Sequence, residues 1–105
     1  MDNYAISFAS ELELRFGGKN ANYIFEVIPG RKFDKIVRRL TGSEQTSVHA
    51  FVERSTGALI KAASWSQPQK DTQGRLAIRY NLADEQEYKR AVESADEFGS
   101  YLYAR

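Results

Sequence analysis

The stretch that determines the fold runs from residue 48 to residue 65 and reads VHAFVERSTGALIKAASW. Residues 48–53 are rich in types that favour strands, and their alternation predicts two faces. Val48, Ala50 and Val52 form one face, and His49, Phe51 and Glu53 form the other. The turn Ser55-Thr56-Gly57 follows, with Gly57 suited to a left-handed conformation, and residues 58–65 are expected to return as the next strand. This hairpin predicts an antiparallel sheet.

Further strands are expected on both sides of the hairpin. Residues 23–28 are aromatic and β-branched and stop at Pro29-Gly30, so residues 33–40 are expected to pair with them across that turn. Residues 75–82 are expected to form a strand after an exposed loop at 67–74. The short apolar run at 101–103 is expected to be a final edge strand.

Two segments have helical spacing. Apolar residues four apart between residues 3 and 16 indicate an amphipathic helix, although residues 12–16 also alternate as a strand would. Asp84 can cap a second helix, with Glu87 three positions on, apolar residues up to Phe98 and an end at Gly99. The expected fold is a single α+β domain over residues 1–105. It has a curved antiparallel sheet of about five strands, a helix in the C-terminal half and a candidate helix at the N-terminus.

Composition excludes several classes of protein. Of the 105 residues, 42% are hydrophobic and 28% are charged, as in globular domains. The absence of cysteine excludes disulfides, thiolate zinc sites and a cysteine nucleophile. No basic leader and no run near the ~20 apolar residues of a membrane span is present, so we expect a cytoplasmic protein without a membrane partner.

The net charge of +1 conceals a strong polarity along the chain. Residues 31–79 hold ten lysines and arginines against four acidic residues, whereas the segments before and after them are both net acidic. The central strands are therefore basic and the helical flanks are acidic. An acidic helix face at Asp84, Glu85, Glu93, Asp96 and Glu97 can meet a basic partner or be a simple solvated face.

A basic sheet that carries exposed aromatic rings is typical of proteins that bind single-stranded nucleic acid, because cations follow the phosphates and rings stack on bases. Lys61 and Trp65 are four residues apart, which predicts one face for both, and Lys35 and Arg79 can flank them. The ring candidates are Phe33, Trp65, Tyr80, Tyr101 and Tyr103. The alternative interpretation is that these rings fill the core and the cations form a solvated face.

The residues do not indicate an enzyme or a cofactor. His49 is the single histidine, so a zinc site would need carboxylate help, and a hydrogen-bonded strand histidine is the favoured interpretation. Gly17-Gly18 and Gly57 match neither a phosphate loop nor a dinucleotide fingerprint. We expect no catalytic residue, no metal and no cofactor.

A set of short motifs spans residues 31–105. They are RKFDKIV at 31–37, SVHAFV at 47–52, TG at 56–57, KAASW at 61–65 with Pro68 and Lys70, RYNL at 79–82 and GSYLYAR at 99–105. In these motifs the chain resembles a group of small proteins encoded by tailed bacteriophages. The resemblance implies a protein made in the cytoplasm of an infected bacterium that acts on nucleic acid or on a host factor.

Two functional hypotheses follow. The first is a non-enzymatic phage accessory protein that binds nucleic acid, preferably single-stranded, through the basic, aromatic sheet face. Its expected contacts are Lys35, Arg38, Lys61, Lys70, Arg75 and Arg79 for phosphates, and Trp65 and Tyr80 for stacking. The second is a protein-interaction module that modulates a host enzyme or assembles with other phage proteins. Opposite charges on one small surface also favour self-association.

Overall fold

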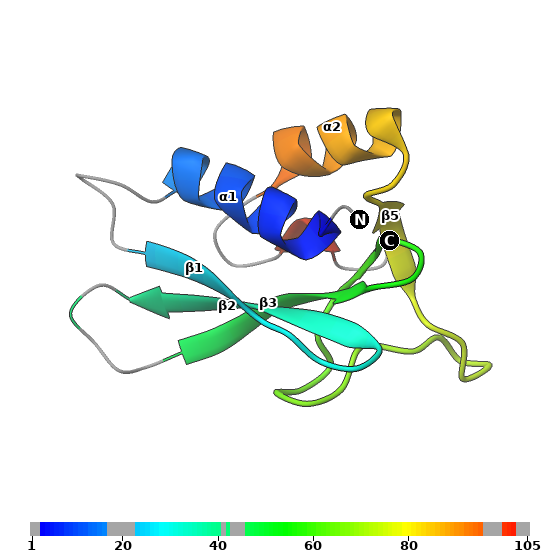
Figure 1. Cartoon of the computed structure of the whole chain (residues 1–105). Helices are drawn as coiled ribbons and strands as arrows, with labels where there is room; N and C mark the ends of the chain where they lie inside the picture. The colour runs from blue at the N-terminus through cyan, green and yellow to red at the C-terminus, as the bar shows by residue number, and fades with distance from the viewer. Residues whose placement is uncertain (1–2, 17–22, 41, 43–45, 96–99, 103–105) are drawn as a thin grey trace.

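The computed structural model describes residues 3–16, 23–40, 42, 46–95 and 100–102. Two helices lie on one side of a five-stranded antiparallel sheet (Figure 1). The elements are α1 (Tyr4–Phe16), β1 (Tyr23–Ile28), β2 (Phe33–Leu40), β3 (Thr46–Glu53), β4 (Ala58–Ile60), β5 (Ile78–Asn81) and α2 (Glu85–Ser94). The strands pair in chain order, β1-β2-β3-β4-β5. The expected α+β class and antiparallel sheet are confirmed, and residues 4–16 form a helix.

The turn between β3 and β4 has the geometry that the sequence predicts. Gly57 has a φ of 80°, and its N–H donates to the Glu53 carbonyl at 2.8 Å. A side chain at this position would be strained twice, because an added Cβ would also lie 2.9 Å from the Ala83 backbone nitrogen. Glycine is therefore required both by the turn and by the close approach of the chain before α2.

A β-bulge at His49 changes the expected faces of β3. In the pairing with β2, Ala50 lies opposite Ile36 but Val48 lies opposite Val37, so His49 is an extra residue. The prediction that His49 shares a face with Phe51 is therefore wrong, because the extra residue shifts the alternation by one. The His49 ring lies on the side of the helices, edge-on to Phe25 at a centroid distance of 5.5 Å.

β4 and β5 are shorter than the sequence predicts. β4 ends at Ile60 rather than at residue 65, and β5 begins at Ile78 rather than at residue 75. Residues 61–77, here called the 61–77 segment, form only the isolated bridges Ala62↔Pro68 and Lys70↔Leu76. Alanine and serine at 62–64 have low strand propensity, which explains the early end of β4. The segment extends from the sheet away from the helices (Figure 1).

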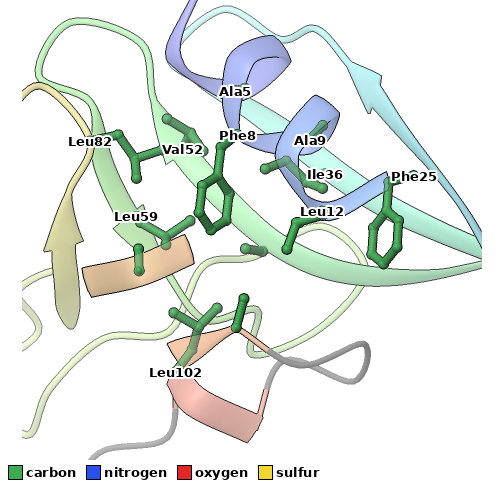
Figure 2. Close-up of a cluster of buried hydrophobic side chains, with 13 residues drawn as sticks. Ala5, Phe8, Ala9, Leu12, Phe25, Ile36, Val52, Leu59, Leu82 and Leu102 are labelled. Atoms are coloured by element: carbon green, nitrogen blue, oxygen red, sulfur yellow. The ribbon is translucent and has the colours of Figure 1, made fainter. Parts of the chain in front are cut away.

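The main core lies between the helices and the sheet. Figure 2 shows Phe8 and Leu12 of α1 among side chains of the strands, which include Ile36, Val52 and Leu59. All five are at most 1% exposed. Because side chains alternate along a strand, the neighbours of these strand residues point to the opposite side of the sheet, here called the helix-free side.

The C-terminal residues close the core as a turn and not as a strand. Ser100–Leu102 is a 3-10 helix, so the predicted edge strand at 101–103 is wrong for Tyr101 and Leu102, and Tyr103 lies outside the described residues. Leu102 is fully buried in the main core, and the Tyr101 hydroxyl lies 2.7 Å from His49 Nε2. In a strand these two adjacent side chains would point to opposite faces, whereas the turn directs both toward the core.

α2 begins at the cap that the sequence predicts. One carboxylate oxygen of Asp84 accepts the N–H groups of Gln86 and Glu87 at 2.9 and 3.1 Å. The helix ends at Ser94, and Phe98 and Gly99 lie outside the described residues. Within the described part of the chain, no helix has the length and apolarity needed to cross a bilayer.

Candidate functional site

A row of paired residues crosses the helix-free side of the sheet and forms the base of the candidate site. One residue comes from each strand, and each pairs with the next: Ile28, Lys35, Phe51, Ile60 and Ile78. Phe51 and Ile60, in the middle of this row, are buried, whereas the isoleucines at its two ends are exposed. The centre of a face that carries no helix is therefore covered by other parts of the chain.

The pair formed by Lys35 and Trp65 lies on this face, beside Phe51. The Lys35 ammonium is 4.2 Å from the centroid of the Trp65 ring and 5.8 Å from that of Phe51. Trp65 comes from the 61–77 segment and keeps 49% of its surface exposed. A cation at this distance over an indole ring is held by the ring quadrupole. The predicted meeting of Lys35 with Trp65 on one face is confirmed.

The other predicted cations of the 61–77 segment are less concentrated. Lys70 is exposed, and Lys61 is half-buried with its ammonium donating to the Ala62 carbonyl at 3.2 Å. Arg75 is exposed, but its guanidinium contacts the Asp71 carboxylate at 3.6 Å and bonds to the Gln73 side chain. The segment therefore supplies one cation in open solvent and two cations with local partners.

Two of the predicted contacts lie elsewhere in the fold. Arg38 alternates to the side of the helices, where its guanidinium lies 4.8 Å from the Tyr23 ring centroid and donates to Ser47 Oγ at 3.1 Å. Tyr80 pairs with Leu59 and packs against the main core. The prediction that Arg38 and Tyr80 lie on the same face as Lys35 is wrong. Arg38 is three residues from Lys35 on β2, so it points to the opposite face, and Tyr80 pairs with Leu59, whose side chain points into the main core.

Arg79 lies between the two faces. It is the extra residue where the register of β4 and β5 shifts, since Ile60 pairs with Ile78 and Leu59 with Tyr80. Its side chain is half-buried, and its Nε makes no hydrogen bond within the described residues. The prediction that Arg79 flanks Lys61 and Trp65 as part of a regular strand is not met.

Comparison with known families gives a match that covers almost the whole chain. A family model matches residues 2–104. The chain belongs to the family of unknown function DUF7717. No match was found among curated proteins or among solved structures. Membership of DUF7717 carries no activity with it, so the function has to be argued from the geometry of this chain.

One further cation lies next to a ring and was not predicted from the sequence. The Lys32 ammonium lies 5.5 Å from the Phe33 ring centroid, and Phe33 meets Phe51 edge-on at 6.2 Å. Lys32 therefore extends the positive face from Lys35 toward the turn before β2. The signal was present in the basic run Arg31-Lys32, but alternation along a strand would place Lys32 and Phe33 on opposite faces. Lys32 lies in a bend before β2, where this alternation does not apply.

His49 is buried and has a side-chain hydrogen-bond partner in this fold. It is 4% exposed, and its Nε2 lies 2.7 Å from the Tyr101 hydroxyl. The expected hydrogen-bonded strand histidine is confirmed, although its ring faces the core and not solvent. Among the described residues, no group of three or more histidines and carboxylates is arranged to hold a metal ion.

Proposed function

We propose that this protein binds nucleic acid, preferably single-stranded, through the helix-free side of its sheet and without catalysing a reaction. The observation that carries the proposal is the half-exposed Trp65 ring with the Lys35 ammonium 4.2 Å from its centroid. An exposed ring beside a cation combines a stacking surface for a base with a contact for the adjacent phosphate.

The charges around this pair support the proposal. Lys32 and Lys70 are exposed, and Lys61 is half-buried close to the end of β4. All three lie in or beside the elements that hold Lys35 and Trp65. Binding should therefore weaken steeply with salt, because each neutralised phosphate releases counterions. Arg38 and Tyr80 have no place in this interface, because they lie on the side of the helices.

A single strand suits this face better than a duplex does. The bases of a duplex are stacked on each other, whereas a single strand can place one base on the Trp65 ring. The resemblance to small phage proteins leads us to place this activity in the cytoplasm of an infected bacterium, where single strands arise during replication.

The test is a titration of a fluorescein-labelled 15-nucleotide oligothymidine by fluorescence anisotropy at about 50 mM salt. Trp65→Ala should weaken binding roughly 5- to 150-fold, which corresponds to ~1–3 kcal/mol for one stacked base. Leu14→Ala is the matched control, because Leu14 is an apolar side chain 79% exposed on α1, on the other side of the sheet.

Three results would count against the proposal. These are the absence of binding by the native chain at low salt, equal losses in the two variants, and tighter binding of a duplex of the same sequence. Circular dichroism of both variants keeps a loss of binding distinct from a loss of folding.

A further inference from the structure

A groove lies between α1 and α2, on the opposite side of the sheet from Trp65. It has a volume of about 650 Å³ and is lined by Tyr4, Ser7 and Glu11 of α1 and by Tyr88, Val92 and Glu93 of α2, among others. This volume is within the range of sites that hold a small ligand or a few side chains, ~300–1,000 Å³. The helix-bearing side therefore has a built concavity of its own.

The floor of the groove is apolar and aromatic. Tyr88 packs edge-on against the buried Phe8 ring, at a centroid distance of 6.0 Å and an interplanar angle of 81°. Leu82, a member of the main core, also lines the groove. Burial raises the pKa of the Tyr88 hydroxyl, a hydrogen bond with Ser7 opposes this, and the Glu11 carboxylate adds to the rise. The hydroxyl is therefore neutral at physiological pH and adds no charge to the floor.

The rim of the groove is acidic. Glu11, Glu85 and Glu93 line it together with one cation, Lys89, and the Arg15 guanidinium donates to the carbonyl of Val92, another lining residue. Within the described part of the chain, none of the three carboxylates forms a salt bridge. Three carboxylates around an apolar floor repel phosphate and attract cations, so this groove is complementary to a basic ligand and not to the nucleic acid of the opposite face.

We propose that the groove between α1 and α2 binds a basic, amphipathic segment of a partner protein. One or two apolar side chains of the segment would fill the groove over Tyr88 and Val92, and its lysines or arginines would meet Glu11, Glu85 and Glu93. Segments of this kind dock between helices by placing one apolar face in the groove.

A second copy of this chain fits the groove less well than a separate partner does. The basic 61–77 segment lies on the opposite side of the sheet from the groove. If the groove of one copy bound the 61–77 segment of the next, the copies would associate head to tail. Such assemblies grow into open filaments unless the rotation between copies closes them into a ring. A partner segment needs no such closure, and it would leave Trp65 free on the other face.

The probe is a fluorescein-labelled 12-residue peptide of lysine, arginine and leucine with its leucines four residues apart, titrated at about 50 mM salt. The control peptide has glutamine in place of each cation. Glu11→Gln combined with Glu93→Gln should weaken binding of the basic peptide on the order of tenfold. Glu13→Gln is the matched control, because Glu13 lies on the same helix and does not line the groove.

The location is checked by ¹⁵N NMR of the labelled protein during the same titration. We expect shifts at residues of the groove and none at Lys35 or Trp65. The proposal is overturned if the basic peptide does not bind, if Glu13→Gln weakens binding as much as the double variant does, or if the shifts fall on the helix-free side. Sedimentation showing that copies of the chain associate through the groove, with the peptide competing, would assign the groove to a second copy instead.

Discussion

The two sides of the sheet differ in what covers them. On one side, two amphipathic helices bury a continuous core that includes Phe8, Leu59 and Leu102, each 0% exposed. On the other side, Phe51 and Ile60 are buried although no helix lies over them, and the 61–77 segment, which has no regular secondary structure, leaves Trp65 half-exposed. The helices bury Phe8 and Leu12 against the sheet, whereas the irregular segment leaves the Trp65 ring half in solvent beside Lys35.

We expect the stability of the fold and the proposed nucleic-acid binding to depend on different sides of the sheet. The side with the helices contains most of the large buried residues, and the proposed nucleic-acid contacts are on the other side, which buries fewer of them. Substitutions on the two sides should therefore change different measurements. Each variant below is accordingly measured both for its free energy of unfolding and for its affinity for the oligothymidine.

The largest effect is expected from Phe8→Ala. Phe8 is fully buried between α1 and the sheet, so its truncation leaves a cavity and should lower the free energy of unfolding by about 3–5 kcal/mol. Ile78→Ala, at the exposed end of the row on the helix-free side, should change it by less than about 0.5 kcal/mol. Urea unfolding followed by circular dichroism measures both. Similar losses in the two variants would show that the two sides stabilise the fold equally.

A smaller loss of stability is expected from Asp84→Ala. The Asp84 carboxylate accepts two N–H groups at the start of α2, and its removal should cost about 1 kcal/mol. Asp84→Asn keeps an acceptor at the cap and should cost much less. Affinity for the oligonucleotide should be the same in both variants, because α2 lies on the other side of the sheet. A loss of affinity at constant stability would contradict this separation.

Lys35 and Arg38 give the sharpest test, since they are three residues apart on β2 and face opposite sides. Lys35→Met should weaken oligonucleotide binding up to about fivefold and lower the slope of log affinity against log salt by about 1. Arg38→Met should change neither quantity. Anisotropy titrations at several salt concentrations measure the slope, and equal slopes in the two variants would place the phosphate contacts elsewhere.

The smallest effect concerns Tyr88 and the pH dependence of stability. Burial raises the pKa of its hydroxyl above the ordinary value of 10.0. As pH rises, the hydroxyl therefore loses its proton in the unfolded chain before it does so in the folded chain. The stability that the neutral Tyr88 hydroxyl contributes is complete below pH 10.0 and is lost as pH rises through the pKa of the folded state. When the pH is raised above 10.0, the free energy of unfolding should fall less in Tyr88→Phe than in the native chain, because phenylalanine has no hydroxyl to titrate. Urea unfolding between pH 8 and 11 measures the difference, and parallel profiles would contradict it.

Much of the fold could be predicted from local signals. The turn at Gly57 and the cap at Asp84 each depend on one residue type whose chemistry is specific to that position, and the structure has both. The strands on either side of Pro29-Gly30 were predicted for the same reason. Signals of this kind involve residues within a few positions of each other, so one sequence is sufficient to find them.

The candidate site was predicted only in part. The wrong predictions concern residues whose side of the sheet depends on the pairing between strands. The bulge at His49 needs no particular residue type and exists only relative to β2, so alternation placed that ring on the wrong face. Tyr80 was assigned to the basic face for a similar reason, since its side depends on its partner Leu59. Lys35 and Trp65 were predicted together, although Trp65 reaches Lys35 from an irregular segment and not from a strand.

The position of Trp65 determines what intrinsic fluorescence can report. It is the single tryptophan of the chain, it is half in solvent, and it belongs to the 61–77 segment. Its emission is therefore sensitive to the surroundings of one local segment and not to the main core. A fluorescence transition that precedes the loss of circular dichroism would record detachment of this segment while the helices remain packed, and quenching by an oligonucleotide would need no added label.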